Sequence, residues 1–208
     1  MRIGFMGGTF SPPHVGHLHS AKEFIDELNL DKLLIIPAKV SPFKVNTEAT
    51  ASDFDRMEMS KICFLPLDGE KCKVEVSDIE MSKDGASYTI ETINDLKTKY
   101  PDDEIIMFVG SDMFLSLERW KNSKEIFEKC SIYTRVRESN ERQIMLETKE
   151  KYQDIYGAKI YFSDDKEFIV SSTEVRNALS SKNFETCRNL LTEEVLGYII
   201  KGGLYFEA

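Results

Sequence analysis

The fold and the chemistry of this chain both depend on one stretch near its N-terminus, Gly7-Gly8-Thr9-Phe10-Ser11-Pro12-Pro13-His14-Val15-Gly16-His17. It follows an apolar run, 2–6, typical of a buried strand, and it precedes apolar residues that recur at helical spacing up to Leu28. The stretch is therefore expected at a strand-to-helix junction. There the first N–H groups of the helix lack intrahelical acceptors and the helix dipole is positive. Such a junction binds anions, and glycines let the backbone approach them closely.

The rest of the chain alternates short apolar runs with helical patterns, which predicts an α/β fold with a Rossmann-like parallel sheet and helices on both faces. The 208 residues fit a single domain, 1–208. Strands are expected at 2–6, 32–37, 71–76, 104–109, 132–137 and 159–163, with a strand end over 77–84 and a loop at 83–85. Helices are expected at 18–28, 52–65, 87–100, 124–129, 140–156, 171–179 and 193–200.

Composition excludes several classes of protein. The formal net charge of −9 argues against binding to duplex nucleic acid, which requires a basic face, although a few cations in one cleft suffice for a small phosphorylated ligand. No apolar run is long enough to cross a bilayer and no signal-peptide pattern precedes the first strand, so a cytoplasmic protein without a membrane partner is expected. The four cysteines have no metal or redox spacing and are interpreted as buried thiols in a reducing compartment. Whether the chain forms a homo-oligomer stays open.

A second candidate anion site lies far along the chain. The stretch Ser171-Ser172-Thr173-Glu174-Val175-Arg176 places hydroxyl caps and an arginine at the start of a helix. Lys44 follows the strand at 32–37, at the sheet edge where α/β proteins bind ligands. The chain contains neither a Gly-x-Gly-x-x-Gly fingerprint nor a Walker sequence. Two anion sites with different side chains, each at the start of a helix, therefore indicate a polyphosphate held at both ends.

All three histidines lie between positions 14 and 19, and His14 and His17 are one helical turn apart, on the same side of a helix. Three interpretations compete for this pair. The first is phosphate binding through imidazole N–H groups, which the glycine-rich approach favours. The second is a packing or capping role. The third is a metal site, which no further ligand spacing completes, so no metal ligands are assigned.

The two signatures resemble those of the nucleotidyltransferase superfamily with the His-x-Gly-His motif. Within it, three middle motifs are similar to bacterial nicotinate-nucleotide adenylyltransferases: Ser87-Tyr88-Thr89, Gly110-Ser111-Asp112 and Leu117-Glu118-Arg119-Trp120. The resemblance covers nearly the whole chain, in the order of that family. It implies adenylyl transfer from ATP to nicotinate mononucleotide, with pyrophosphate as the other product. It also implies that Mg²⁺ arrives with the ATP and not in an all-protein cage.

The resemblance also assigns residues to the two substrates. His14 and His17 would contact the ATP phosphates, with His17 making the strongest contact in the transition state. The other residues on the ATP side are Gly8, Thr9, Phe10, Lys44, Ser172, Thr173 and Arg176, of which the last four would hold the β- and γ-phosphates. Those on the mononucleotide side are Tyr88, Thr89, Gly110, Asp112, Trp120 and Arg137.

On the mononucleotide side, Trp120 would stack on the pyridine ring, Tyr88 and Thr89 would help to bind its carboxylate, and Asp112 would accept hydrogen bonds from a ribose. Each has a simpler interpretation from the residues alone. A lone tryptophan serves as a packing anchor, and Asp112 and Thr89 suit helix caps.

The sequence departs from the family pattern at three places. Ser11 stands where the family has aspartate, and Phe43 stands where it has a histidine before the lysine. Arg137 is followed by Glu138-Ser139 where the family has Pro-Gly. The alternatives are another adenylyltransferase of the superfamily, such as pantetheine-phosphate adenylyltransferase, and a non-catalytic nucleotide-binding module.

Overall fold

The structure is a computed structural model of the chain, and it describes residues 1–39, 51–82, 88–136, 141–163 and 170–206. Six strands form one sheet in the order β3-β2-β1-β4-β5-β6, and every neighbouring pair is parallel. The predicted Rossmann-like parallel sheet is confirmed. The strands are β1 (Arg2–Gly8), β2 (Lys32–Pro37), β3 (Lys73–Val76), β4 (Glu104–Val109), β5 (Ser131–Arg135) and β6 (Ile160–Ser163).

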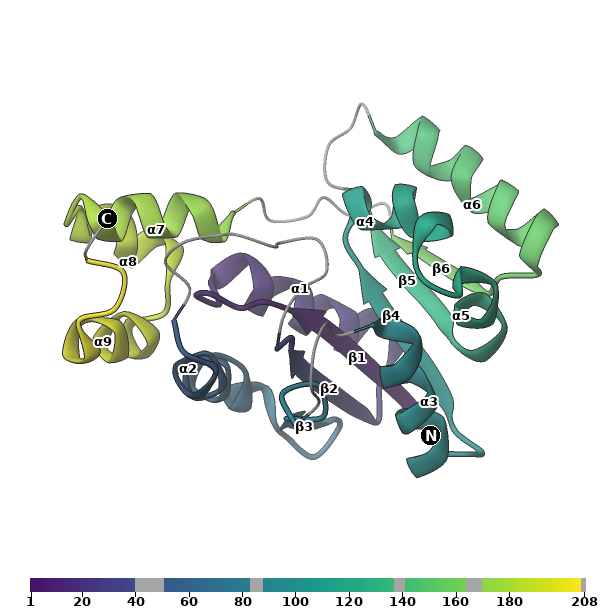
Figure 1. Ribbon diagram of the computed structural model, residues 1–208, viewed down its shortest axis with the longest axis horizontal. Coiled ribbons are helices and arrows are strands. Elements are labelled where there is room, and N and C mark those ends of the chain that lie inside the picture. The colour runs from purple at the N-terminus through teal and green to yellow at the C-terminus, as the bar shows by residue number, and fades with distance from the viewer. Residues whose placement is uncertain (40–50, 83–87, 137–140, 164–169, 207–208) are drawn as a thin grey trace.

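Helices cover both faces of this sheet (Figure 1). One hydrophobic core lies under α1 (Val15–Leu28), α2 (Asp53–Phe64), α7 (Ser172–Ser180), α8 (Phe184–Leu190) and α9 (Glu193–Gly202). The other lies under α3 (Thr89–Lys99), α4 (Ser111–Ser116), α5 (Ser123–Lys129) and α6 (Arg142–Tyr156). Short 3₁₀ turns, η1 (Leu65–Leu67) and η2 (Leu117–Arg119), follow α2 and α4.

The central strands explain the two cores. In β1, the side chains of Ile3 and Phe5 enter the core beneath α3 to α6, whereas Met6 enters the core on the opposite face. Gly4 lies where α1 crosses the strand, because a Cβ atom there would be only 2.7 Å from a ring carbon of Phe24. The N-terminal apolar run therefore places α1 directly against the sheet.

The strand order reverses between β1 and β4, so the connections leaving these two strands run to opposite faces. In open α/β sheets this switch point, at the carboxyl ends of the strands, is where ligands bind. The first signature leaves β1 at that point, and the segment Gly110-Ser111-Asp112 leaves β4 beside it.

Most predicted elements are present with ends shifted by one to three residues. The predicted strand at 71–76 begins at Lys73, where pairing with β2 begins. Past Val76 the ladder continues for one bond, from the Ser77 N–H to the Ile35 carbonyl, and a turn follows. The predicted loop at 83–85 lies outside the described residues.

Two helices were not predicted. The polar strand end after β4 continues directly into α4, and a further short helix, α8, precedes α9. α4 has six residues and α8 has seven. An apolar period is weak over so few turns, although α5, which also has seven residues, was predicted at 124–129.

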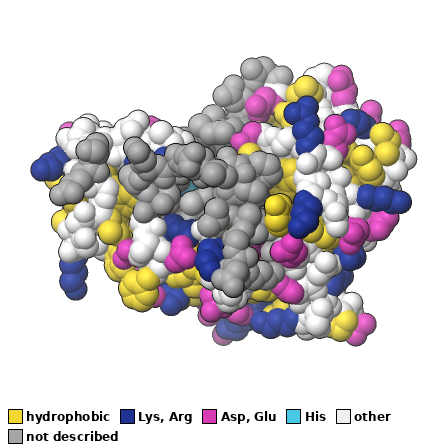
Figure 2. Space-filling view, viewed as in Figure 1, with side chains coloured by type: hydrophobic (Ala, Val, Ile, Leu, Met, Phe, Trp, Pro, Cys, Tyr) yellow, Lys and Arg dark blue, Asp and Glu magenta, His cyan; other side chains and the backbone are white. Residues whose placement is uncertain are grey.

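Basic and acidic side chains are interspersed over the described surface seen in Figure 2. Within the described ranges, every helix is too short or too polar to span a lipid bilayer. The four cysteines are all buried and none forms a disulfide. Burial raises the pKa of the Cys63 thiol to about 12, in agreement with the interpretation of these residues as inert buried thiols.

Candidate active site

The first signature forms a tight turn between β1 and α1. The side chain of Phe10 is buried, and its backbone adopts the left-handed conformation, with φ of 47°. A non-glycine residue is strained in this conformation. Its ring packs over Gly8, because a Cβ atom on Gly8 would lie 3.0 Å from two carbons of that ring. A side chain at position 8 would therefore be crowded by this ring, a packing reason for glycine that adds to the predicted close approach of the backbone to an anion.

The two histidines cap α1 together. His14 is the N-cap residue, and its Nδ1 accepts a hydrogen bond from the His17 N–H at 3.3 Å. The Nδ1 atom of His17 in turn accepts from the His14 N–H at 3.3 Å, so the pair forms a capping box made of two imidazoles. The rings stack at a centroid distance of 3.6 Å. The capping role and the predicted common side are therefore both observed.

This capping has a chemical consequence. An imidazole that accepts a hydrogen bond at Nδ1 carries its proton, when neutral, on Nε2. Both rings are thereby held in the tautomer that can donate from Nε2 to an anion. His14 is buried, whereas His17 is half-buried and touches the Phe10 ring edge-on at 5.1 Å. His17 is the more accessible of the two donors.

The second signature docks onto the first. Ser171 caps α7 by accepting from the Glu174 N–H at 3.1 Å. The Ser172 hydroxyl donates to the carbonyl of Pro12 at 3.1 Å, and Nη1 of Arg176 donates to the carbonyl of Ser11 at 2.9 Å. The N-termini of α1 and α7 are therefore joined through the backbone of the first signature.

Arg176 is held from a second side as well, because its Nη2 donates to the Thr173 hydroxyl at 3.0 Å. This fixes the guanidinium over the first turn of α7, where the helix dipole is positive. Arg176 and Thr173 are therefore hydrogen-bonded to each other where α7 meets the first signature.

Ser11, which stands where the family has aspartate, is tied to the C-terminal segment. Its hydroxyl lies 2.9 Å from the hydroxyl of Tyr205, and it accepts from the Ala51 N–H at 3.3 Å. Ser11 is buried. A hydroxyl suits this position, because it forms hydrogen bonds with two neutral partners.

A cavity of about 470 Å³ opens at the carboxyl ends of β1 and β4, and we call it the carboxyl-edge cavity. Six residues predicted for the site line it: Gly8, Thr9, Tyr88, Thr89, Asp112 and Trp120. Gly110 is the N-cap residue of α4 next to this lining. Neither histidine and no residue of α7 is part of the lining.

The predicted residues thus fall into two groups joined by the turn at residues 8–10. The histidines with Ser172, Thr173 and Arg176 form one, and the carboxyl-edge cavity forms the other. Lys44 and Arg137 lie outside the described residues, as do the Phe43 and Glu138-Ser139 departures.

The alternative interpretations of the cavity residues fare differently. Asp112 is exposed in the first turn of α4, where Gly110 is the N-cap, so the prediction that Asp112 caps a helix is wrong. Thr89 is the first residue of α3 and Tyr88 is the N-cap without a side-chain bond, so Thr89 is not a cap either. Trp120 is half-buried and packs against the core while lining the cavity.

Sequence reasoning missed Arg56, on α2. The residue is 2% exposed, and its guanidinium donates to the carbonyls of Thr9 at 2.9 Å, Ala38 at 2.6 Å and Lys39 at 3.3 Å, while pairing with Asp53 at 2.6 Å. It ties together the segments that leave β1 and β2. The signal was present, because Arg56 precedes buried α2 residues at helical spacing, Met59, Ser60 and Cys63.

Three other charged residues of the cavity lining were also missed: Glu80, Arg119 and Lys121. Glu80 is buried and accepts from the Thr92 hydroxyl at 2.7 Å. Arg119 and Lys121 flank Trp120 on the turn η2 and the segment after it. A cation on each side of the tryptophan was visible in the sequence and could have suggested an anionic ligand.

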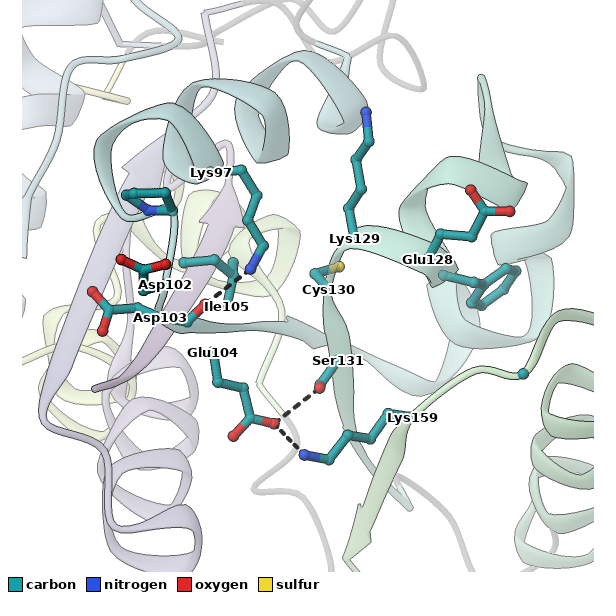
Figure 3. Close-up of a pocket in the computed structure, with 13 residues that line it drawn as sticks. Lys97, Asp102, Asp103, Glu104, Ile105, Glu128, Lys129, Cys130, Ser131 and Lys159 are labelled. Carbon is teal, nitrogen blue, oxygen red and sulfur yellow. Dashed lines mark hydrogen bonds and ion pairs between the residues drawn. The ribbon is translucent and has the colours of Figure 1, made fainter.

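A second pocket, of about 530 Å³, lies at the opposite edge of the sheet, at the amino ends of β4 and β5 (Figure 3). We call it the amino-edge pocket. Several of its charged groups bond to the protein itself: Lys97 donates to the Asp103 carbonyl at 2.9 Å, and Glu104 accepts from Lys159 at 2.7 Å and from Ser131 at 3.0 Å. Burial alone would raise the pKa of Glu104, but the hydrogen bonds from Lys159, Tyr161 and Ser131 outweigh it and lower the pKa to about 2.

The described residues contain no group of three or more histidine, cysteine, aspartate or glutamate side chains placed to hold a metal ion.

Comparison with known proteins identifies relatives along nearly the whole chain. A family model described as cytidylyltransferase-like matches residues 5–178. The chain is 34% identical over 202 residues to a probable nicotinate-nucleotide adenylyltransferase of Clostridium novyi, covering 97% of this chain and 98% of that protein. It is 32% identical over 204 residues to the nicotinate-nucleotide adenylyltransferase of Bacillus subtilis, covering 98% of both.

The fold has solved counterparts. A Plasmodium falciparum nicotinic acid mononucleotide adenylyltransferase complexed with NaAD superposes with a TM-score of 0.79 at 19% identity, covering 98% of this chain and 97% of that one. At this identity the likeness speaks for the fold alone.

Proposed function

The chain belongs to the nicotinate-nucleotide adenylyltransferase family, and from this premise we propose that it transfers the adenylyl group of ATP to nicotinate mononucleotide in NAD biosynthesis. The acceptor's phosphate oxygen attacks the α-phosphorus, the bond from that phosphorus to the β-phosphate bridge breaks, and pyrophosphate leaves. The observation that carries the proposal is the docking of Ser172 and Arg176 on the Pro12 and Ser11 carbonyls, beside a cavity lined by Trp120.

The donor half of the site consists of the joined N-termini of α1 and α7. The Nε2–H groups of His14 and His17 are assigned as hydrogen-bond donors to the ATP phosphates. Of the two, His17 is assigned the strongest contact to the transition state. Because the Ser172 hydroxyl is engaged by Pro12, we assign its backbone N–H to the leaving phosphates, together with Thr173 and Arg176. Gly8, Thr9 and Phe10 supply backbone contacts between the two halves.

Lys44, whose surroundings lie outside the described residues, is assigned to the β- and γ-phosphates by the family pattern alone. Arg137 is assigned to the mononucleotide on the same basis.

The acceptor half is the carboxyl-edge cavity. Trp120 offers an aromatic face for the pyridine ring, and the start of α3 at Tyr88 and Thr89 offers backbone N–H groups for the pyridine carboxylate. Asp112 is exposed at the rim and accepts ribose hydroxyls, next to the N-cap Gly110. A cavity of about 470 Å³ lies within the range of small-ligand sites, about 300 to 1,000 Å³.

The reaction makes limited chemical demands on the protein. The acceptor phosphate is already anionic, so no general base is required. The obstacle is the repulsion between two polyanions, and catalysis therefore consists of alignment and of stabilising charge at the α-phosphorus. We propose that Mg²⁺ enters with the ATP and supplies further charge neutralisation on its phosphates.

The test is pyrophosphate release from ATP with three acceptors compared side by side, namely nicotinate mononucleotide, nicotinamide mononucleotide and pantetheine phosphate. The proposal expects the fastest release with a pyridine mononucleotide. Release with pantetheine phosphate alone would assign the chain another acceptor within the superfamily, and release with none of them would leave a nucleotide-binding module without transferase activity.

A further inference from the structure

Lys121 lines the carboxyl-edge cavity, which is the acceptor half of the site, and directly follows the motif that supplies Trp120. Its Nζ atom is 3.8 Å from the centroid of the Tyr88 ring, a cation–π geometry, and 3.1 Å from the carboxylate of Glu91. Lys121, Tyr88 and Trp120 all line the cavity. The ammonium group is thereby held over the start of α3 by contacts on two sides.

The start of α3 is the part of the cavity that suits an anion. The N–H groups of Glu91 and Thr92 donate to the Tyr88 carbonyl, which is the first acceptor of the helix. The N–H groups of Thr89 and Ile90 come before these donors and have no acceptor within the helix. A helix start by itself attracts any electronegative group, including the carbonyl oxygen of an amide. A full positive charge beside it favours a carboxylate over a neutral carboxamide.

Among the described residues, the lining of the cavity as a whole does not provide that charge. These residues include two carboxylates, Glu80 and Asp112, against the two cations Arg119 and Lys121. These charges balance formally, so selection of an acidic ligand depends on where a cation is placed. Of the two cations, Lys121 is the one whose charged atom lies against Tyr88, which directly precedes α3.

We propose that Lys121 is a specificity-determining residue, whose ammonium group selects the carboxylate of nicotinate mononucleotide over the carboxamide of nicotinamide mononucleotide. The inference rests on the proposed function, since it presumes that the pyridine ring lies on Trp120. Glu91 competes with the substrate carboxylate for the same ammonium group, so the pair acts as a latch that the substrate partly displaces.

The experiment measures kcat/KM for both mononucleotides at saturating ATP in the wild type, Lys121→Met, Lys121→Arg, Arg119→Met and a control, Lys124→Met. Lys124 lies on α5 outside the cavity lining, and its side chain is 78% exposed. We expect Lys121→Met to lower kcat/KM for the acid roughly tenfold, the loss of one charge-assisted hydrogen bond, and to change that for the amide less than about twofold. Lys121→Arg should keep most of the preference, and Lys124→Met should change neither value.

A further variant tests the latch. Glu91→Gln removes the competing carboxylate, so kcat/KM for the acid should rise by roughly two- to threefold, the size of an exposed ion pair. A fall for the acid in this variant would contradict the latch.

Three results would overturn the assignment while the proposed function stands. One is a wild type that uses acid and amide equally well, and another is an equal fall for both substrates in Lys121→Met, which marks a purely structural ion pair. The third is loss of the preference in Arg119→Met and not in Lys121→Met. A wild type that releases pyrophosphate with neither mononucleotide would refute the proposed function, and this inference with it.

Discussion

The amino and carboxyl edges of the sheet carry cavities of similar volume, about 530 and 470 Å³, but they differ in what their charges do. In the amino-edge pocket, Lys159 and Ser131 converge on Glu104, and Lys97 bonds a backbone carbonyl, so protein groups satisfy one another. In the carboxyl-edge cavity, aromatic faces and a helix start open onto the junction of two signatures.

Volume therefore does not distinguish the cavity that we assign to the substrate from the other one. The amino-edge pocket is similar in volume, yet a ligand there would have to displace hydrogen bonds that stabilise the fold. At the carboxyl edge, parallel strands and the helices that follow them direct unsatisfied N–H groups toward one place. Substitutions at the carboxyl edge should therefore change kinetics, and substitutions at the amino edge should change stability.

The largest expected effect is at the donor half. His17→Ala should lower turnover by roughly two to three orders of magnitude with a smaller loss of ATP binding, because its Nε2–H is assigned to charge that develops in the transition state. Steady-state kinetics and a binding titration with ATP measure the two quantities. His19→Ala is the matched control on the same helix and should retain wild-type turnover. Unchanged turnover in His17→Ala would contradict the assignment of His17 to the transition state.

The next effect is in the acceptor half. Trp120→Ala should raise KM for nicotinate mononucleotide roughly 5- to 100-fold, the worth of one aromatic stacking contact, and leave KM for ATP nearly unchanged. Trp120→Phe should recover much of the affinity. Equal increases in both KM values would instead mean that Trp120 supports the fold beneath both halves.

At the amino edge the expected effect is on stability. Glu104→Gln should lower the free energy of unfolding at pH 7 by about 1–2 kcal/mol, because the pKa of this partly exposed carboxyl is lowered to about 2 in the folded protein. A lowered pKa stabilises the fold above the ordinary value of 4.5, and that contribution is lost as the pH falls toward 2. The difference from wild type should therefore shrink over this range in urea unfolding curves.

Glu128→Gln is the control for this prediction. The side chain of Glu128 is 52% exposed, and its ion pair with Lys124 is long, at 3.9 Å. Its effect should stay below about 0.5 kcal/mol. A change in kcat in Glu104→Gln at neutral pH would contradict the assignment of the amino-edge pocket to stability alone.

The smallest effect concerns Cys130, which lines the amino-edge pocket. Burial raises the pKa of its thiol to about 12, so almost no thiolate exists at pH 8. Treatment of the native protein with iodoacetamide at that pH should leave Cys130 unmodified, as peptide mass spectrometry would show, and modification should follow unfolding in urea. Rapid labelling of the native protein would mean that this pocket opens or activates the thiol.

The order of the elements and the capped starts of two helices could be predicted from the sequence, because both are local. Apolar runs mark β1, β2 and β4, and hydroxyl caps mark the starts of α2 and α7 at Ser52 and Ser171. An apolar period is weak over one or two turns, and α4 and α8 were missed, although α5, of similar length, was predicted. The donor and acceptor residues came from motif resemblance, and their roles stay predictions.

Only the tertiary structure decided how these parts meet. It placed β1 beside β4 at the switch point, docked Ser172 and Arg176 on carbonyl groups of the first signature, and put Arg56 under the Thr9 carbonyl. Every residue has a carbonyl, so these acceptors leave no mark in the sequence. Likewise, nothing in the sequence pattern brings Lys121 to Tyr88, because that contact joins segments on separate elements. Local patterns determined the elements and the chemistry at their ends, and long-range packing determined which of those ends face one cavity.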